Sequence, residues 1–326
     1  MNILIFSAVF YPAIGGIENQ TLLLIQEFIK KGHQVKVITY QKQKATLPNI
    51  DIYYAPSYLS FLKAYNWCDT FYMPNISLKG LWLLLLNPKK HWVISHNDYH
   101  FFHRKGLIAK LKSYFVKLAT QNVAVSKSIA SHLDTPSKVI PNSYDESMFK
   151  IYPEEQRTYD FVFLGRLVTQ KGCDMLIRAC SKLNRPFTLG IIGIGAEKSR
   201  LEALTKELNL TNEIKFHGLV TKVDLAKMLN RYKVMVIPSI EEEGFGMVAL
   251  EGMACGCKIL AANAGGLSDA VSSFGKKFEM KDTNELTRLL SESLDDNTAA
   301  ITDDLSAYLK LHHRESVADN YLTVFK

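Results

Sequence analysis

The 326-residue sequence predicts an α/β protein with two doubly wound parallel-sheet domains. Three observations support this fold class. The length accommodates two domains of ordinary size. Short apolar segments alternate with helix-period segments, and the alternation restarts at Tyr159, after a polar linker over 142–158. We therefore expect a first domain over residues 1–150, a second domain over 151–310 and a final helix over 311–326.

The first domain opens with a βαβ unit. Residues 2–8 form an apolar strand, and residues 18–31 place apolar side chains at helical spacing. Gly32 ends this helix, and residues 34–40 return as a strand. Later strands of the same sheet are expected over 71–73, 92–95 and 122–125.

The second domain repeats the pattern. Residues 161–164 form a strand, 173–183 a helix, 188–192 a strand and 197–208 a charged helix. Further strands are expected over 213–217, 234–238 and 258–261. Ligands of doubly wound sheets bind at the carboxyl ends of the strands, so the loops that follow the strands are the candidates for chemistry.

The composition favours a cytoplasmic protein. Apolar residues make up 47% of the chain, enough for globular cores, and the five cysteines show no zinc or disulfide spacing. The first residues enter a strand directly, without the features of a signal peptide. The longest aliphatic run, 81–86, is too short to span a membrane.

The charge is divided unevenly between the two halves. Residues 1–150 hold 17 lysines and arginines against 8 acids, whereas residues 151–326 hold 22 against 24. This asymmetry predicts an anionic partner for the first domain, either a membrane surface or an anionic glycolipid. Nucleic acid is not expected as a partner, because no nucleic-acid-binding motif occurs.

The basic and aromatic segment 100–117 is the candidate for membrane contact. Five apolar side chains share one face of a helix there: Leu107, Ile108, Leu111, Phe115 and Leu118. One interpretation is an interfacial helix on an anionic membrane, and the other is an ordinary amphipathic helix packed on its own sheet.

The segment 238–256 carries the most specific signal. It places Glu243 and Glu251 around a Gly-Phe-Gly turn between a buried strand and a helix. The helix N-terminus offers backbone N–H groups to an anion, and carboxylates accept hydrogen bonds from sugar hydroxyls. This combination predicts a nucleotide-sugar site, and the alternative is a capped helix with surface glutamates.

Two further loops follow strands. The loop 165–172 places Arg166 and Lys171 where both could reach one diphosphate, although they could also be solvated loop cations. The pair Gly15 and Gly16 permits close approach of a ligand to the backbone or forms a plain tight turn.

His96 ends a strand of the first domain. It could hydrogen-bond a sugar hydroxyl, or it could be structural. No Asp-x-Asp motif occurs, so no metal and no other cofactor are expected. Gly193-x-Gly195 lacks the third glycine of a dinucleotide fingerprint, so NAD binding is not expected either.

In order and spacing, the motifs resemble those of the retaining glycosyltransferases of family 4, whose fold is GT-B. The resemblance runs nearly end to end and includes Gly15-Gly16-Ile-Glu, Val123-Ala-Val-Ser-Lys127, Gly165-Arg166 with Lys171-Gly172, the Glu243/Glu251 segment and Gly265-Gly266-Leu267. It implies two Rossmann-like domains facing a central cleft, with the final helix crossing back to the first domain. The sequence departs from the family pattern at Ser143, Gly252, Lys258 and Asp269.

The resemblance also implies roles for residues. Arg166 and Lys171 would hold the donor diphosphate, Glu251 the ribose and Glu243 the donor sugar. His96 would lie over that sugar, and Gly16 would face the diphosphate. The backbone N–H groups that would contact sugar and phosphate belong to Phe245, Gly246, Met247 and Val248.

The function implied is transfer of a hexose from a nucleotide sugar, with a UDP-sugar favoured, to a glycan or lipid-linked glycan. The family retains anomeric configuration without a bound metal, so no nucleophile is assigned. Such an enzyme would act at the inner face of the cytoplasmic membrane, in lipopolysaccharide or other surface-polysaccharide assembly. The alternatives are a nucleotide-sugar epimerase and a non-catalytic nucleotide-sugar-binding protein.

Overall fold

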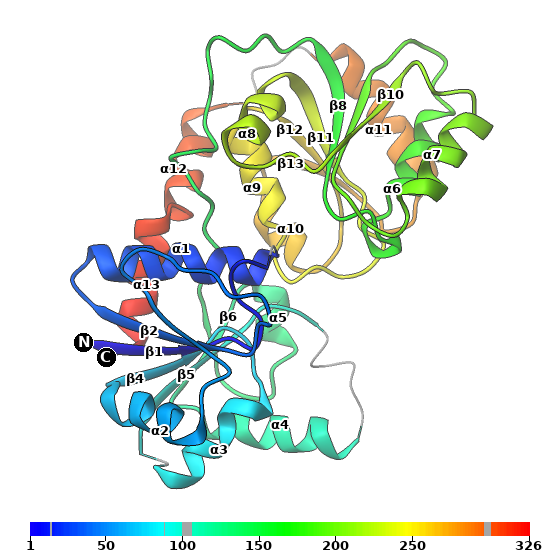
Figure 1. Ribbon diagram of the computed structural model, residues 1–326. Helices are drawn as coiled ribbons and strands as arrows, with labels where there is room; N and C mark the ends of the chain where they lie inside the picture. The colour runs from blue at the N-terminus through cyan, green and yellow to red at the C-terminus, as the bar shows by residue number, and fades with distance from the viewer. Residues whose placement is uncertain (14, 88, 100–105, 297–300) are drawn as a thin grey trace. The chain divides into compact units, whose positions relative to one another are not determined.

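The computed structural model describes residues 1–13, 15–87, 89–99, 106–296 and 301–326. The chain forms two units (Figure 1). Unit 1 comprises Met1–Ser143 and His312–Lys326, and unit 2 comprises Tyr144–Leu311. The chain therefore leaves unit 1 at Ser143, before the expected boundary at residue 150, and re-enters it at His312.

Unit 1 is built on a parallel sheet of order β3-β2-β1-β4-β5-β6-β7. Its strands are β1 (Asn2–Phe6), β2 (Gln34–Thr39), β3 (Asp51–Tyr54), β4 (Thr70–Met73), β5 (His91–His96), β6 (Gln121–Ala124) and β7 (Lys138–Val139). Its helices are α1 (Gly16–Lys30), α2 (Tyr58–Trp67), α3 (Leu78–Leu86), α4 (Leu107–Leu118), α5 (Lys127–Ser131) and α13 (Arg314–Val324). The strand order reverses between β1 and β4, as in a doubly wound fold.

Both faces of this sheet are covered, so its central strands are apolar on both sides. On β1, Ile3 and Ile5 point into a cluster with α1 and α13. The alternate residues Leu4 and Phe6 point into a second cluster, with α2, α3 and α4. Figure 1 shows these three helices together on one side of the sheet.

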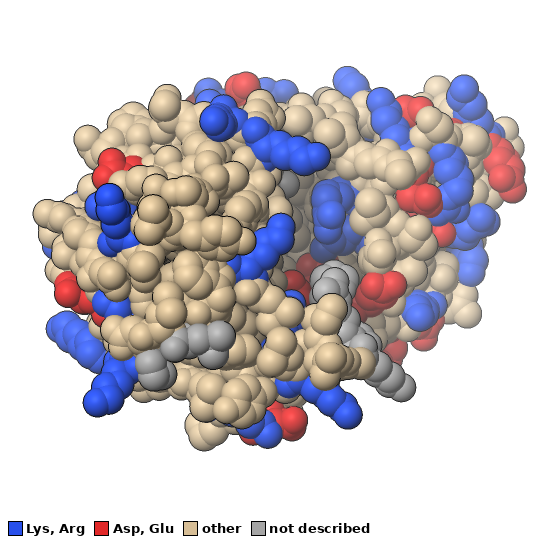
Figure 2. Space-filling view, turned by 60° about the horizontal axis from the view of Figure 1, so that its bottom comes forward, with Lys and Arg blue, Asp and Glu red and all other residues tan. Residues whose placement is uncertain are grey.

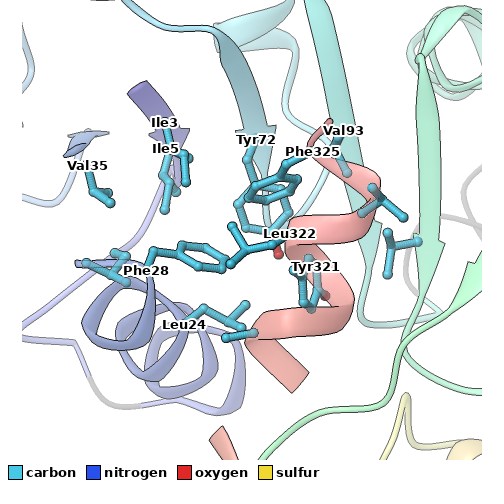
Figure 3. Close-up of a cluster of buried hydrophobic side chains, with 14 of the residues drawn as sticks. Ile3, Ile5, Leu24, Phe28, Val35, Tyr72, Val93, Tyr321, Leu322 and Phe325 are labelled. Carbon is cyan, nitrogen blue, oxygen red and sulfur yellow. The ribbon is translucent and has the colours of Figure 1, made fainter. Parts of the chain in front are cut away.

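The C-terminal helix α13 is held on unit 1 by packing and by buried hydroxyl groups. Phe325 lies against Phe28 of α1 and Tyr72 of β4, with ring centroids 5.4 and 5.3 Å apart (Figure 3). The Ser95 hydroxyl lies 3.0 Å from the Tyr72 hydroxyl and 2.9 Å from that of Tyr321. The helix is therefore part of the core of unit 1, not an appendage.

Unit 2 has a parallel sheet of order β10-β9-β8-β11-β12-β13, which reverses between β8 and β11. Its strands are β8 (Tyr159–Leu164), β9 (Leu189–Ile192), β10 (Ile214–Gly218), β11 (Tyr232–Ile237), β12 (Lys258–Ala262) and β13 (Gly275–Phe278). Its helices are η1 (Thr169–Lys171), α6 (Cys173–Cys180), α7 (Lys198–Glu207), α8 (Lys222–Asn230), α9 (Met247–Ala254), α10 (Gly266–Val271), α11 (Thr283–Asp295) and α12 (Asp303–Leu311). The two parallel Rossmann-like sheets confirm the expected fold class.

Two surface expectations can be compared with the structure. In the part of the chain that is described, no helix is long and apolar enough to cross a membrane. Within the segment 100–117, residues 100–105 lie outside the described residues, Gly106 is the N-cap of α4, and residues 107–117 belong to α4. On the expected apolar face of α4, Phe115 is buried whereas Leu107, Ile108, Leu111 and Leu118 are exposed.

Candidate functional site

The candidate site lies at the carboxyl ends of β8 and β11, the two neighbouring strands between which the order of the unit 2 sheet reverses. At such a switch point the loops of the two strands run to opposite faces of the sheet and leave room for a ligand. The loop after β8 carries Arg166 and Lys171, and the loop after β11 carries Glu243. The fold therefore brings together side chains that are far apart in the sequence.

The loop after β8 is shaped by one glycine. Gly172 has a φ of 64°, and a Cβ added there would lie 1.9 Å from the carbonyl oxygen of Pro238, at the end of β11. Only glycine fits this left-handed turn and close approach. Lys171 precedes it at the end of η1, and the exposed Arg166 lies earlier in the loop.

The loop after β11 leads into the N-terminus of α9. Gly246 caps this helix with a φ of 84° and offers no capping side chain. The first N–H groups of a helix have no acceptor within the helix, so those of Met247 and Val248 are oriented for an external acceptor. Phe245, immediately before the cap, is buried.

Backbone hydrogen bonds join the loops of consecutive strands into one surface. The Ile240 N–H donates to the Gln170 carbonyl over 3.0 Å, which ties the β11 loop to the β8 loop. The Gly266 N–H donates to the Glu243 carbonyl over 2.8 Å, which ties the β12 loop to the β11 loop. A rigid set of loops of this kind can hold charged groups in fixed positions before a ligand arrives.

Gly193 and Gly195 act as scaffold residues for the Arg166 loop, a role that the sequence analysis missed. A Cβ on Gly193 would lie 1.9 Å from the Gly165 carbonyl oxygen, and one on Gly195 would lie 2.2 Å from that of Leu167. The loop after β9 therefore packs backbone to backbone against the loop after β8. The paired glycines were the available signal, but they were considered only as a dinucleotide motif.

Lys171 and Glu243 form an ion pair, with the Lys171 Nζ 2.9 Å from the Glu243 Oε1. The buried Ser239 also donates a hydrogen bond from its hydroxyl to Glu243. A carboxylate beside an anion site would repel the anion, and the lysine compensates that charge. Ser239, four residues before Glu243, is a second residue that the sequence analysis did not assign.

Glu251 lies on α9, about one turn beyond its N-terminus. Burial raises the pKa of Glu251 to about 7, and the negative charge of Asp145 contributes in the same direction. Asp145 is a further residue near the site that the sequence analysis missed. Near neutral pH the Glu251 carboxyl is therefore poised between its protonated and ionised forms.

This raised pKa predicts a pH-dependent stability. Below the ordinary value of 4.5 the carboxyl is protonated in both the folded and the unfolded chain. Between 4.5 and about 7 the unfolded chain ionises while the folded chain keeps the proton. The Glu251 contribution to the free energy of unfolding is therefore lost as the pH rises through this window, by roughly 3 kcal/mol at most.

The measurement is urea unfolding of unit 2 at about pH 5 and about pH 8. We expect the free energy of unfolding of Glu251→Gln to rise relative to that of the wild type as the pH rises. The exposed Glu241→Gln is the control and should show no such change. Parallel pH profiles of Glu251→Gln and wild type would contradict the assignment.

In unit 1, Gly16 and His96 lie at the carboxyl edge of the sheet. Gly16 begins α1, where a Cβ added to Gly15 would lie 2.2 Å from a carboxylate oxygen of Glu18. The acid Glu18 thus already lies beside this helix N-terminus, which weakens the attraction of that terminus for an anion.

His96 is the last residue of β5 and is only 2% exposed. Its Nε2 lies 2.9 Å from the Asn122 Oδ1, and the Asn122 amide nitrogen donates to the Val116 carbonyl over 2.9 Å. The Asn122 oxygen is therefore an acceptor, and the His96 Nε2 carries a proton. Burial lowers the pKa of His96, against the opposing effect of Asn122 and Asp98, so this side chain is neutral near pH 7.

Among residues outside the gaps at 14, 88, 100–105 and 297–300, no group of three or more His, Cys, Asp or Glu side chains is placed to hold a metal ion. The cysteines at 68, 173, 180, 255 and 257 are all buried free thiols. Of the candidate site residues in unit 2, Lys171 and Glu243 are in direct contact, Arg166 lies in the same loop as Lys171, and Glu251 lies on the helix that follows the Glu243 loop.

Comparison with known proteins identifies the family. The family described as Glycosyl transferases group 1 matches residues 145–309, just over half of the chain and nearly all of unit 2. A relative from Methanocaldococcus jannaschii, the uncharacterized glycosyltransferase MJ1178, is 36% identical over 167 residues, which cover 48% of this chain and 45% of the relative. The chain thus spans about half the length of the curated relatives that it matches first.

Solved structures share the fold over almost the whole chain. The structure of Anabaena Alr3699/HepE in complex with UDP and glucose has a TM-score of 0.80 at 19% identity, covering 99% of this chain and 98% of that chain. The lipopolysaccharide outer core galactosyltransferase WaaB has a TM-score of 0.76 at 18% identity, covering 99% of both chains. The chain therefore belongs to the group 1 glycosyltransferase family, of the family 4 type, with the GT-B fold.

Proposed function

We propose that the chain is a glycosyltransferase that moves a hexosyl group from a nucleotide sugar to a hydroxyl group of a glycan or lipid-linked glycan. The observation that carries the proposal is the Lys171–Glu243 ion pair, which joins the loop that also carries Arg166 to the loop that leads into the α9 N-terminus, at the switch point of unit 2. Cations and helix N–H groups suit a diphosphate, and carboxylates suit sugar hydroxyls. A nucleotide sugar carries both kinds of group.

Each residue has a chemical task in this proposal. Arg166 and Lys171 bind the diphosphate and stabilise its charge as it leaves. The backbone N–H groups at Phe245, Gly246, Met247 and Val248 contact sugar and phosphate. Glu243 holds donor-sugar hydroxyls, Glu251 holds the ribose, Gly16 faces the diphosphate and His96 hydrogen-bonds the donor sugar.

The reaction replaces one bond at the anomeric carbon by another. The bond from the anomeric carbon to the diphosphate oxygen breaks, and its electron pair leaves with the diphosphate. The acceptor hydroxyl oxygen forms the new bond, and its proton passes to the departing phosphate oxygen. We propose that the acceptor attacks on the face from which the diphosphate leaves, so that configuration is retained without an enzyme nucleophile and without a metal.

A UDP-sugar is the proposed donor. The support is the solved HepE structure, which was obtained with UDP and glucose, and a further structure of that protein with UDP-glucose. The proposed setting is lipopolysaccharide or other surface-polysaccharide assembly on the inner face of the cytoplasmic membrane. Its support is the basic first half of the chain and the likeness to WaaB.

A turnover assay tests the proposal. The protein is incubated with UDP-hexoses, with and without a mixture of lipid-linked glycans, and both UDP release and glycosylated product are measured. We expect UDP release and glycosylated product only when an acceptor is present. Donor conversion without acceptor would instead indicate an epimerase, and donor binding without any turnover would indicate a non-catalytic binding protein.

The variant Glu243→Ala tests the site within the same assay. We expect it to lower kcat/KM by about 10²-fold or more, because hydrogen bonds to the reacting sugar strengthen in the transition state. Glu242→Ala is the matched control, since Glu242 is the exposed neighbour in the same loop. Equal activity of the two variants would contradict the role of Glu243.

A further inference from the structure

The outer side of α2, α3 and α4 exposes many large apolar side chains. Leu107 is 82% exposed, and Tyr58 and Leu59 are 76% and 72% exposed. We call this surface the α2–α4 face and define it by Tyr58, Leu59, Leu86, Leu107, Ile108, Leu111, Tyr114 and Leu118. All three helices bury their inner sides in one cluster on one side of the sheet, so their outer sides are exposed together.

The helix α4 contributes a continuous apolar stripe to this face. Leu107, Leu111, Tyr114 and Leu118 follow the spacing i, i+4, i+7 and i+11, which places them in one row along a helix. Phe115 and Val116 are buried. The helix is thus anchored by one side and presents a second apolar side to the outside, which is unusual for a helix whose function is only to cover a sheet.

The charged side chains of the three helices have one sign. The sequences of α2, α3 and α4 contain lysines but no aspartate or glutamate. The exposed Lys110 and Lys117 are seven residues apart and lie along one border of the apolar stripe. Other lysines of these helices are Lys63, Lys79 and Lys112. In Figure 2, where this side of unit 1 comes forward, the surface is largely tan with blue side chains around it and little red.

We propose that the α2–α4 face docks unit 1 onto an anionic lipid bilayer. Apolar side chains of this kind insert into the interface between headgroups and acyl chains, and lysines beside them attract anionic headgroups. A second copy of the chain is a poorer occupant, because a two-fold contact would place lysines opposite lysines with no acid on the three helices to pair with them. A bilayer supplies both the apolar layer and the negative charge.

This proposal deepens the proposed function by naming the surface that would bring the enzyme to a lipid-linked acceptor. It rests on the proposed function only for that purpose, because lipid binding is measured without turnover. A protein that binds vesicles but transfers no sugar would contradict the proposed function alone. A protein that transfers sugar to soluble glycans but ignores vesicles would contradict this inference alone.

The test is co-sedimentation of the full chain with two kinds of vesicle. One is phosphatidylcholine alone, and the other is phosphatidylcholine mixed with phosphatidylglycerol. We expect binding to the mixed vesicles and at least about tenfold weaker binding to the neutral ones. The double variant Lys110→Glu with Lys117→Glu should weaken binding to the mixed vesicles by about 30-fold or more, because two attractive charges become repulsive. A tenfold loss of affinity corresponds to roughly 1.4 kcal/mol of binding free energy.

The apolar part of the face needs its own variant. Leu111→Ser with Leu118→Ser should weaken binding to the mixed vesicles by about tenfold or more, because the inserted apolar area is lost. Both residues are exposed, so these changes should leave the fold intact, which circular dichroism checks. Leu311→Ser with Ile151→Ser removes exposed apolar side chains elsewhere and should bind like wild type.

The matched charge control is Lys206→Glu with Lys277→Glu, two exposed lysines of unit 2. It makes the same change in net charge and should retain most of the binding. Equal losses in the two charge variants would mean that only total charge matters and would overturn the assignment of this face. Light scattering gives a second outcome that would overturn the assignment. If it showed a dimer that dissociates when Leu111 and Leu118 are replaced, a second copy of the chain would cover the face.

Discussion

Replacing Arg166 by alanine is expected to lower kcat/KM for sugar transfer by about 10²- to 10³-fold. The guanidinium is exposed, and within the described residues it has no carboxylate partner, so it is available to a ligand. A planar fork of N–H donors matches two phosphate oxygens at once, and its contribution grows as negative charge develops on the leaving diphosphate. Stability should change by less than about 0.5 kcal/mol, because an exposed side chain is removed.

Two further variants separate charge from geometry at this position. Arg166→Lys keeps the charge but loses the fork, and we expect it to recover only part of the activity. Arg178→Ala removes an exposed arginine on α6, away from the loop, and should behave like wild type. An Arg166→Ala protein with unchanged kcat/KM would remove Arg166 from the site.

Replacing Gly172 by alanine is expected to have a large structural effect on the site. The residue has a φ of 64°, and the added carbon would lie 1.9 Å from the Pro238 carbonyl oxygen and 3.0 Å from the Ile240 side chain. The left-handed conformation alone costs a non-glycine residue about 1–3 kcal/mol, and the contact with the backbone forces the two loops apart. We expect the free energy of unfolding to fall by about 3 kcal/mol or more.

The same change should also weaken binding of the nucleotide. Lys171 precedes Gly172, and its ion pair with Glu243 depends on the closeness of the β8 and β11 loops. Urea unfolding measures the first effect and nucleotide titration the second. Gly165→Ala is the matched control in the same loop: its nearest neighbour would be the Phe163 ring at 3.5 Å, an ordinary contact. If both alanine variants behaved alike, the close contact between the loops would not matter for the site.

The sequence predicted the fold class because parallel strands buried on both faces are continuous apolar runs. Strands such as β8 and β11 are of this kind, and the helices between them have clear periodicity. The edge strand β3 was missed because its residues are only partly buried and do not form an apolar run. Unit 2 begins at Tyr144, and its first residues combine the buried Tyr144 and Phe149 with polar side chains, a composition that does not distinguish a linker from the start of a unit.

The candidate site was predictable where one short segment carries several groups. Glu243, the glycine turn and Glu251 lie on a single strand, loop and helix, so their order in the sequence is also their order in space. Ser239 and Asp145 were missed for a different reason. Their importance depends on a hydrogen bond to Glu243 and on closeness to Glu251, and neither contact has a pattern in the sequence.

The α4 helix shows a similar limit. Its periodicity indicated an amphipathic helix but could not separate the side that packs on the sheet from the side that remains outside. Phe115 and Leu111 are both apolar and four residues apart, yet the first is buried and the second is 43% exposed. Only the placement of the helix on the sheet decides between them.

The most direct test of the donor site is thermal stabilisation by UDP, GDP, ADP and CMP, measured on wild type and on Arg166→Ala. A ligand that binds the folded chain raises its apparent stability by mass action, by about 2.7 kcal/mol at a concentration of 100 times its Kd. We predict stabilisation of the wild type by a nucleoside diphosphate, with UDP first, and loss of most of that stabilisation in Arg166→Ala. Equal stabilisation of both proteins, or none of the wild type by any of the four, would contradict it.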